Sequence, residues 1–386
     1  MKIADGNRIA LLETGDRYFP VLEAACREAR EEIHVETYLF ENDATGHRIA
    51  HALAEAARRG VVVRVLADGF GTRNVAPALR AVLIAGGVHL RVYRPAMRGF
   101  PLRLQHLRRL HRKLVVVDGR VGFCGGINLV DDRDAGGDVP RYDFTVRVEG
   151  PLVGDLHRAV RRLWLLTGLT ARPRTTDPRM RWRARPAPIP GGHPASFVTR
   201  DNLRHRRAIE DAYLRAIAAA RHDVLIACAY FLPGRRIRHA LTEAVRRGVR
   251  VRLLLQGRPD HLLVHHATHG LYGTFQRAGI EVYEYQPAHL HAKVACVDDT
   301  WATVGSSNID PFSLWLSREA NVILHDRRLV AELRTSLEHA IANAALPITP
   351  DLARPLGFLT RLRAALFYQL ARGVVQFAGF AAREEL

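Results

Sequence analysis

The sequence contains few cysteines, and their spacing excludes the usual cysteine-based sites. No Cys-x-x-Cys pair and no metal-binding spacing occurs among the four, which are Cys26, Cys124, Cys228 and Cys296. Each lies in an apolar or helical context. We therefore expect buried free thiols in a reducing compartment, and we expect neither a metal nor a cofactor in the protein.

Long hydrophobic runs are also lacking. No run of about 20 apolar residues occurs, so no segment is predicted to cross a bilayer. The first residues have neither the charged start nor the apolar core of a signal peptide. We expect the chain to stay in the cytoplasm, where it can still lie on a membrane surface.

Acidic residues are outnumbered by basic ones. The 386 residues include 57 Lys and Arg against 39 Asp and Glu, which gives a formal net charge of +18. Such a surplus favours a polyanionic partner, either nucleic acid or an anionic membrane. The alternative is that a generally Arg-rich composition makes the surface helices basic. The length is sufficient for two domains.

An internal repeat organises the chain. Residues 51–66 closely match residues 239–254, and both segments predict an amphipathic helix that ends at a glycine (Gly60, Gly248) before a buried strand. A strand precedes each helix, and a further helix, a glycine and a strand follow. This order predicts a duplicated α/β domain with largely parallel, helix-covered sheets.

The repeat sets the expected domain boundaries. We predict a first domain over residues 1–170, an Arg- and Pro-rich linker over 171–195, a second domain over 196–345 and an amphipathic tail over 346–386. The first half carries about eight extra residues before its motif, within 95–110.

Each half contains one copy of the motif His-x-Lys-x₄-Asp. The two copies are His111, Lys113 and Asp118 in the first half and His291, Lys293 and Asp298 in the second. Residues two apart in a strand share a face, so each His and Lys should project together. A Gly-rich turn follows each copy at the same distance. We expect these turns to offer phosphate oxygens their backbone N–H groups and an Asn amide, at Gly126, Asn128, Ser306 and Asn308.

These residue types suit transfer of a phosphodiester. Lys113 and Lys293, with the two Asn amides, can neutralise the charge of a pentacoordinate transition state without a metal. One imidazole can attack phosphorus while the other protonates the leaving oxygen. This division of labour requires the two rings to lie on opposite sides of one phosphate, so the halves should share a single active site.

The paired motifs resemble the phospholipase D superfamily, whose mark is two H-x-K-x₄-D motifs, each followed by G-[GS]-x-N. The resemblance implies two α-β-α sandwich domains related by a pseudo-two-fold axis, and a covalent phosphohistidine intermediate. It implies His111 as nucleophile and His291 as general acid, with the reverse order left open. It gives Asp118 and Asp298 a supporting role.

Two downstream acids, Asp143 and Glu319, occupy positions at which the superfamily orients its catalytic imidazoles. The sequence leaves open which acid serves which histidine. An ordinary salt bridge is the alternative for each.

A finer resemblance narrows the substrate. Segments spread along the chain are similar to bacterial cardiolipin synthases of the B type, at 5–15, 35–38, 110–118, 229–234, 301–311 and 319–326. This resemblance implies transfer of a phosphatidyl group between two phosphatidylglycerol molecules with release of glycerol. The alternatives are a hydrolase or a nuclease of the same superfamily.

Two segments support a lipid substrate. Residues 97–110 mix Leu and Phe with five Arg or His, and residues 355–380 alternate apolar groups with Arg. Both suit an anionic membrane surface, although each could instead be an ordinary packed helix. Nothing resembles an aromatic platform for bases, so we expect no nucleic-acid partner. We expect a peripheral protein on the cytoplasmic face of the inner membrane. The sequence leaves the oligomeric state open.

Overall fold

The computed structural model describes residues 2–73, 75–95, 108–133, 137–170, 185–202, 204–258 and 262–349. Most of the basic segment 97–110, most of the predicted linker and nearly all of the tail therefore lie outside the described residues. None of the described helices is long and apolar enough to cross a bilayer.

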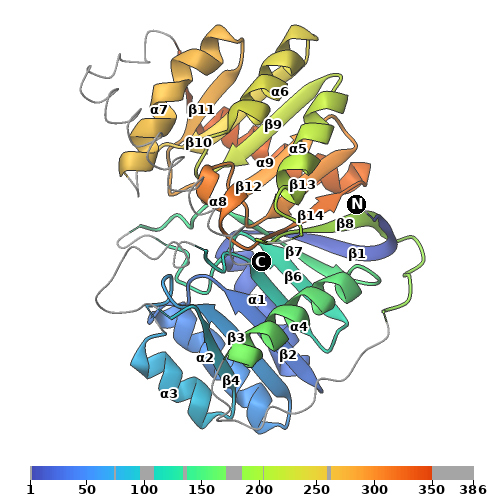
Figure 1. Ribbon diagram of the computed structural model, residues 1–386, viewed down its shortest axis with the longest axis vertical. Coiled ribbons are helices and arrows are strands. Elements are labelled where there is room, and N and C mark those ends of the chain that lie inside the picture. Colours follow the sequence, from blue (N-terminus) through green and yellow to red (C-terminus); the bar gives the residue numbers. More distant parts are fainter. Residues whose placement is uncertain are drawn as a thin grey trace.

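The fold is α/β, as predicted, and its elements repeat (Figure 1). The first half contains β1 (Ala4–Glu13), α1 (Thr14–Glu28), β2 (Glu32–Thr37), α2 (Ala44–Arg58), β3 (Val62–Asp68), α3 (Pro77–Ala85), β4 (His89–Tyr93), β5 (Lys113–Val117), β6 (Val121–Gly125), β7 (Phe144–Glu149) and α4 (Val153–Thr170).

The second half follows the same order. It contains β8 (His193–Arg200), α5 (Ala208–Ala219), β9 (Asp223–Cys228), α6 (Arg235–Arg246), β10 (Arg250–Gln256), α7 (Leu262–Arg277), β11 (Glu281–Tyr285), β12 (Lys293–Val297), β13 (Trp301–Gly305), α8 (Pro311–Trp315), β14 (Glu319–Leu324), α9 (Arg327–Ala344) and β15 (Ala345–Pro347). Strand β8 begins inside the range predicted as linker, and β15 extends into the range predicted as tail.

The described strands form one continuous sheet of fifteen. Its order is β15-β11-β10-β9-β12-β13-β14-β8-β1-β7-β6-β5-β2-β3-β4, so the two halves meet where β1 pairs with β8 in antiparallel orientation. Apart from the edge strand β15, each half has the same strand order when read outward from this junction. This arrangement is the pseudo-two-fold pairing that the sequence predicts.

The expectation of largely parallel sheets is wrong. Only β2-β3-β4 and β9-β10-β11 are parallel, while the motif strands pair antiparallel with both neighbours. The reason is local: the tight turns at Asp118 and Asp298, both with φ near +50°, reverse the chain and make hairpins of β5-β6 and β12-β13. Strands joined by a short turn must run antiparallel.

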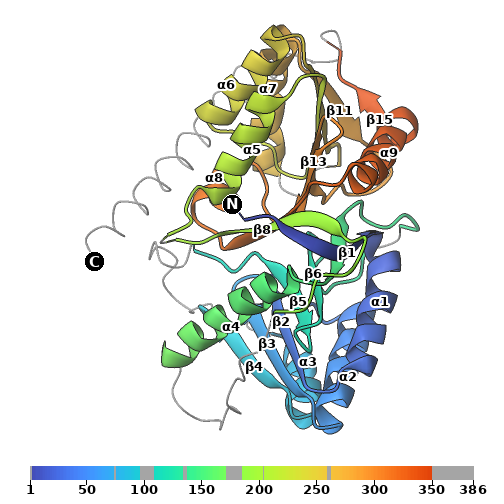
Figure 2. The same ribbon diagram turned by 90° about the vertical axis from the view of Figure 1, so that its right-hand side faces the viewer.

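Helices cover both faces of the sheet. In the first half α1, α2 and α3 lie on one face and α4 on the other (Figure 2). Helix α2 illustrates why the helices pack on the sheet. Its apolar residues Ile49 and Leu53, one turn apart, are buried against strand residues such as Val63. Its end at Gly60, with φ +91°, and the end of α6 at Gly248, with φ +86°, fit the predicted caps.

One hydrophobic core cluster joins the halves. It contains α4 and β5 residues, such as Leu156 and Leu114, together with β12 and α9 residues, such as Val294 and Leu333. All four cysteines are buried free thiols, as predicted, and burial raises their pKa to about 12. The shared core fixes the two motif strands relative to each other.

Candidate active site

The two motif histidines face one cleft between the halves. The cleft has a volume of about 680 Å³. Residues from both halves line it, among them Tyr38, Phe70, Arg109, His111, Asn128, Arg141, Gln256, His289, His291, Asn308 and Ser317. The structure thus brings together both histidines and both motif asparagines that the sequence singled out.

Backbone pairing between the halves holds this arrangement. The N–H group of His111 donates to the carbonyl of Arg318 at 3.0 Å, immediately before β14 of the other half. At the equivalent place, the N–H of His291 donates to the carbonyl of Tyr142 at 2.9 Å, just before β7. Each motif therefore lies beside the acid-bearing strand of the opposite half.

The acids serve the histidines crosswise. Nδ1 of His111 is 2.9 Å from Oε1 of Glu319, and Nδ1 of His291 is 2.5 Å from Oδ2 of Asp143. A carboxylate that accepts the Nδ1 proton leaves the lone pair of a neutral ring on Nε2. This answers the question that the sequence left open, because each acid reaches across the interface between the halves.

The Gly-rich turns contact the two orienting acids. The backbone N–H groups of Gly126 and Ser306, which we expected to bind phosphate, donate instead to the carbonyls of Phe144 and Ala320. The Ser306 hydroxyl donates to Glu319 at 2.5 Å. A Cβ atom at Gly126 would collide with the carboxylate of Asp143. Strand pairing continues through these turns, and the phosphate-binding role of Gly126 and Ser306 stays a prediction.

Each motif lysine bonds to the backbone of the histidine in its own motif. Nζ of Lys113 donates to the carbonyl of His111 at 2.9 Å, and Nζ of Lys293 donates to the carbonyl of His291. Both side chains are buried. Burial, assisted by the charge of Lys293, lowers the pKa of Lys113 to about 7, although Glu319 opposes the shift. An entering phosphate anion would favour the charged form.

The two asparagines are oriented by contacts on their amide oxygens. Oδ1 of Asn128 accepts a hydrogen bond from the N–H of Leu39 at 3.1 Å, and Oδ1 of Asn308 is 4.0 Å from Sγ of Cys228. With the oxygens so engaged, the amide nitrogens are the groups that can donate to a ligand in the cleft.

The motif aspartates lie at the far ends of their strands. Asp118 accepts hydrogen bonds from the N–H groups of residues 30–32, and Asp298 accepts them from residues 221–223. Neither is among the described residues that line the cleft. Through these hydrogen bonds each aspartate fixes the start of the neighbouring strand. The spacing between the Lys and the Asp of each motif therefore reflects the length of the motif strand.

Burial dominates the electrostatics of the histidine–acid pairs. It lowers the pKa of both His111 and His291 below the ordinary value, and for His291 the nearby charges of Lys293 and Lys113 act in the same direction. It raises the pKa of Asp143 to about 7, against the effect of the lysines. The His291–Asp143 pair can therefore retain a proton near neutral pH.

Sequence reasoning missed several residues that line the cleft or hold the segments that line it. The ring of Tyr38 packs edge-on against His111, with centroids 4.8 Å apart, and lies 5.4 Å from Nζ of Lys113. Asp68 and Gln256, at the ends of β3 and β10, accept the N–H groups of Leu110 and Leu290. Tyr38 follows β2, while Asp68 and Gln256 are the last residues of β3 and β10. A position at the carboxyl end of a parallel strand is the sequence signal that could have identified these residues.

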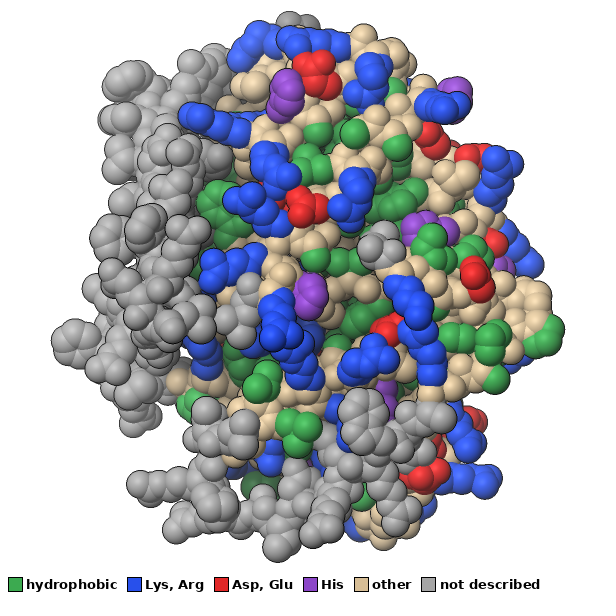
Figure 3. Space-filling model, turned by 45° about the vertical axis from the view of Figure 1, so that its right-hand side comes forward, with side chains coloured by type: hydrophobic (Ala, Val, Ile, Leu, Met, Phe, Trp, Pro, Cys, Tyr) green, Lys and Arg blue, Asp and Glu red, His purple; other side chains and the backbone are tan. Residues whose placement is uncertain are grey.

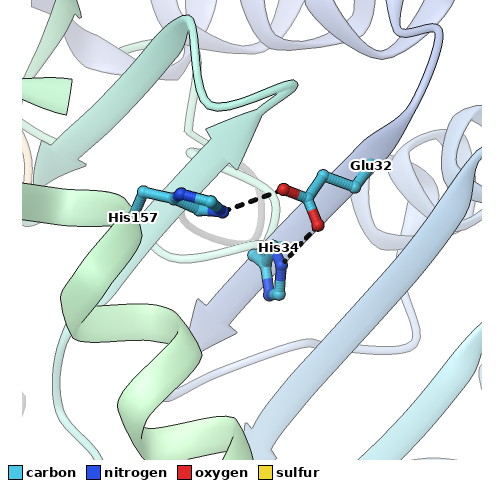
Figure 4. Close-up of side chains that lie close together, drawn as sticks. All are labelled: Glu32, His34 and His157. Carbon is cyan, nitrogen blue, oxygen red and sulfur yellow. Dashed lines mark hydrogen bonds and ion pairs between the residues drawn. The ribbon is translucent and has the colours of Figure 1, made fainter. Parts of the chain in front are cut away.

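One group of buried side chains has the composition of a metal site. Among the described residues, Glu32, His34 and His157 bring a ligand atom each within 4.8 Å of one another, between β2 and α4 (Figure 4). However, Arg64 lies 3.4 Å from the same Glu32 carboxylate. A guanidinium in this position neutralises the carboxylate and disfavours a divalent cation, so the group is a buried ion-pair cluster.

This repeated fold, with a His-x-Lys motif in each half whose two histidines line one shared cleft, defines the phospholipase D-like class. The family described as "Cardiolipin synthase, PLD-like domain" matches residues 22–164 and 213–341, and the chain belongs to this family. The structure and the family match together confirm the fold and the resemblance predicted from the sequence.

Several curated relatives of this chain are named as cardiolipin synthases. The chain is 43% identical to cardiolipin synthase B of Escherichia coli over 88% of this chain and 81% of that protein. It is 32% identical to cardiolipin synthase A of Pseudomonas putida, over 86% of this chain and 68% of that protein. A probable cardiolipin synthase of Bacillus subtilis is 30% identical, over 94% and 70%.

Solved structures share the fold. The phosphatidylserine synthase of Haemophilus influenzae superposes with a TM-score of 0.70 at 15% identity, over 97% of this chain and 94% of that one. The polyphosphate kinase of Porphyromonas gingivalis superposes with a TM-score of 0.59 at 18% identity, over 96% and 53%. At these identities the likeness concerns the fold alone.

Proposed function

We propose that the protein is a cardiolipin synthase, which transfers a phosphatidyl group from one phosphatidylglycerol to a hydroxyl of another and releases glycerol. The crosswise pairs His111–Glu319 and His291–Asp143, both facing one cleft, are the observation that carries the proposal. The 43% identity to a protein named cardiolipin synthase B supports the choice of substrate.

The first step forms a covalent intermediate. Nε2 of His111 attacks phosphorus, and the bond between phosphorus and the glycerol oxygen breaks as the P–N bond forms. His291 gives its proton to that oxygen, so that neutral glycerol leaves. Lys113 and Lys293 balance the charge on the pentacoordinate phosphorus, and the two Asn amides donate to its oxygens.

The second step reverses these roles. A hydroxyl of the acceptor lipid gives its proton to His291 and its oxygen attacks phosphorus. The P–N bond breaks, cardiolipin leaves, and both histidines return to their starting states. The crosswise acids keep each imidazole in the tautomer that this exchange of protons requires.

The protein would work as a peripheral enzyme on the cytoplasmic face of an anionic membrane. The net charge of +18 favours such a surface. Lys and Arg side chains spread over the face drawn in Figure 3, where acidic side chains are sparser. Phe70, which lines the cleft, is 61% exposed and could enter the lipid interface beside the site.

The test incubates the purified protein with phosphatidylglycerol vesicles and resolves the products by mass spectrometry. Cardiolipin and glycerol in equal amounts are expected, and His111→Ala should abolish both. Phosphatidic acid as the sole lipid product would instead indicate a hydrolase. Cleavage of DNA without any lipid turnover would indicate a nuclease.

A further inference from the structure

A buried arginine, Arg200, lies opposite one of the two orienting acids. In the register of β8 and β14, Arg200 is the partner of Glu319, whose carboxylate is hydrogen-bonded to Nδ1 of His111. Residues directly opposite each other in antiparallel strands share a face of the sheet. The Arg200 side chain is buried, and it is not among the described residues that line the cleft. A guanidinium therefore neighbours the His111–Glu319 pair without contacting a substrate in the cleft.

The Arg200 guanidinium also holds the backbone that precedes Glu319. It donates hydrogen bonds to the carbonyls of Trp315 and Ser317. The next carbonyl along the chain, that of Arg318, accepts the N–H of His111 at 3.0 Å. Arg200 thus fixes the segment between α8 and β14, which supplies both the backbone partner and the acid partner of His111.

Several charged or titratable groups surround Glu319 and Arg200. Glu319 interacts electrostatically with His111, Lys113, Arg200, Asp310 and Tyr38. Arg200 in turn interacts with Asp201, Arg206 and Arg318. Asp310 disfavours an ionised Glu319, since the two acids repel: burial raises the pKa of Asp310 to about 6, and Glu319 adds to this shift.

Arg200 acts against that repulsion. Burial lowers its pKa to about 10, and the charge of Glu319 is the largest electrostatic influence that opposes the shift. Arg200 therefore remains charged at neutral pH. A cation near a carboxylate favours the ionised form of that carboxylate, so Arg200 offsets the effect of Asp310 on Glu319.

The other orienting acid has a neutral residue at the equivalent place. Thr14 faces Asp143, and its N–H donates to the carbonyl of Asp143 at 2.8 Å. Charges near the His291–Asp143 pair come from Lys113, Lys293, His111, Asp132 and Arg141. Burial raises the pKa of Asp143 to about 7 against the effect of the lysines. The two acids therefore have different neighbours on the adjoining strand, a buried cation for Glu319 and a threonine for Asp143.

We propose that Arg200 is a positioning residue of the active site, which holds the segment before β14 against His111 and keeps Glu319 ionised. This inference rests on the proposed function, in which Nε2 of His111 bonds to phosphorus. The ring of that intermediate carries hydrogen on Nδ1 and phosphorus on Nε2, so it is positively charged and an ionised Glu319 balances it. Arg200 thereby suits the His111 pair to the covalent step and leaves proton donation to His291.

The test measures the pH dependence of kcat/KM in Arg200→Gln and Arg200→Lys. Loss of the positive charge favours the protonated form of the His111–Glu319 pair. The pKa of the pair should therefore rise in Arg200→Gln, and the acidic limb should move up by about one pH unit. Arg200→Lys keeps the charge but cannot form the same paired hydrogen bonds, so the limb should stay in place while kcat falls about tenfold.

Arg252→Gln is the matched control. Arg252 is another buried arginine, in β10, which pairs with Asp223 and Glu338 and is not among the described residues that line the cleft. Its replacement should leave the acidic limb in place. An unmoved limb in Arg200→Gln, or equal shifts in both Arg200 variants, would overturn the inference. If thermal unfolding shows that Arg200→Gln does not fold, Arg200→Lys alone decides, because a shifted limb or an unchanged kcat would contradict the inference.

Two substrates separate this inference from the proposed function. Phosphatidylglycerol vesicles report cardiolipin formation, and bis-p-nitrophenyl phosphate reports cleavage of a simple phosphodiester. The p-nitrophenolate group leaves with little help from a general acid, so the acidic limb of its release reports on the nucleophile and its acid. Diester cleavage without cardiolipin would overturn the proposed function, while the limb would still test Arg200. A protein that cleaves neither substrate would overturn both.

Discussion

Glu319, at the start of β14 in the second half, accepts a hydrogen bond from Nδ1 of His111 in the first half at 2.9 Å. The pair Asp143–His291 repeats this relationship in the opposite direction. Each half thus supplies a histidine that the other half orients. Neither half contains a complete pair, so the two must be joined for the proposed chemistry.

Replacing Glu319 tests this dependence. Glu319→Gln keeps the shape of the side chain but no longer fixes the Nδ1 proton, so we expect kcat to fall at least about a hundredfold. The charge of Glu319 raises the pKa of His111 against the effect of burial. Its removal should therefore lower that pKa, and the acidic limb of kcat/KM should move to lower pH. A limb that moves upward would contradict the assignment.

Gly126 should be needed to admit Asp143 beside His291. In Gly126→Ala the new methyl group would meet the Asp143 carboxylate, so we expect kcat to fall about tenfold or more. Gly270 provides the control, because a Cβ atom there meets nothing within 4 Å. Gly270→Ala, in helix α7, should keep full activity. Equal activity in both variants would show that the position of Asp143 is not critical.

Tyr38 should act through its ring and not its hydroxyl. The ring packs against His111 and lies near the ammonium of Lys113. Tyr38→Phe should retain activity, whereas Tyr38→Ala should lower kcat roughly three- to thirtyfold, the range of a partly desolvated cation–π contact. Steady-state kinetics of the two variants separate these cases. A defect in Tyr38→Phe equal to that in Tyr38→Ala would instead assign the role to the hydroxyl.

Asp298 should contribute to stability and not to catalysis. Asp298→Ala removes the acceptor of three backbone N–H groups, and we expect the free energy of unfolding to fall by about 1–3 kcal/mol. The folded fraction should keep a kcat within about twofold of wild type. Denaturant unfolding monitored by circular dichroism, with kinetics on the same samples, measures both.

The stabilisation by Asp298 should depend on pH. Burial raises its pKa, but the three N–H groups outweigh that effect, so the pKa of the folded state lies below the ordinary value. A lowered pKa stabilises the fold above the unfolded pKa, and this contribution disappears as pH falls through the folded pKa. The difference between wild type and Asp298→Ala should shrink below about pH 4. A constant difference would show that the charge is irrelevant.

The sequence by itself determined the repeat, the α/β class and the residues that could carry the chemistry. These follow from local rules: Gly60 and Gly248 end helices because glycine tolerates positive φ, and a His and a Lys two apart in a strand share a face. The same local rules also caused an error, because the sheets were expected to be mostly parallel.

Only the tertiary structure decided which groups meet. The pairing of Glu319 with His111 spans more than half of the chain, and it depends on how β1 and β8 join the two halves into one sheet. No local pattern encodes such a contact, because both acids occupy equivalent places in the repeat. Packing of the shared core between the two halves selects the crosswise arrangement.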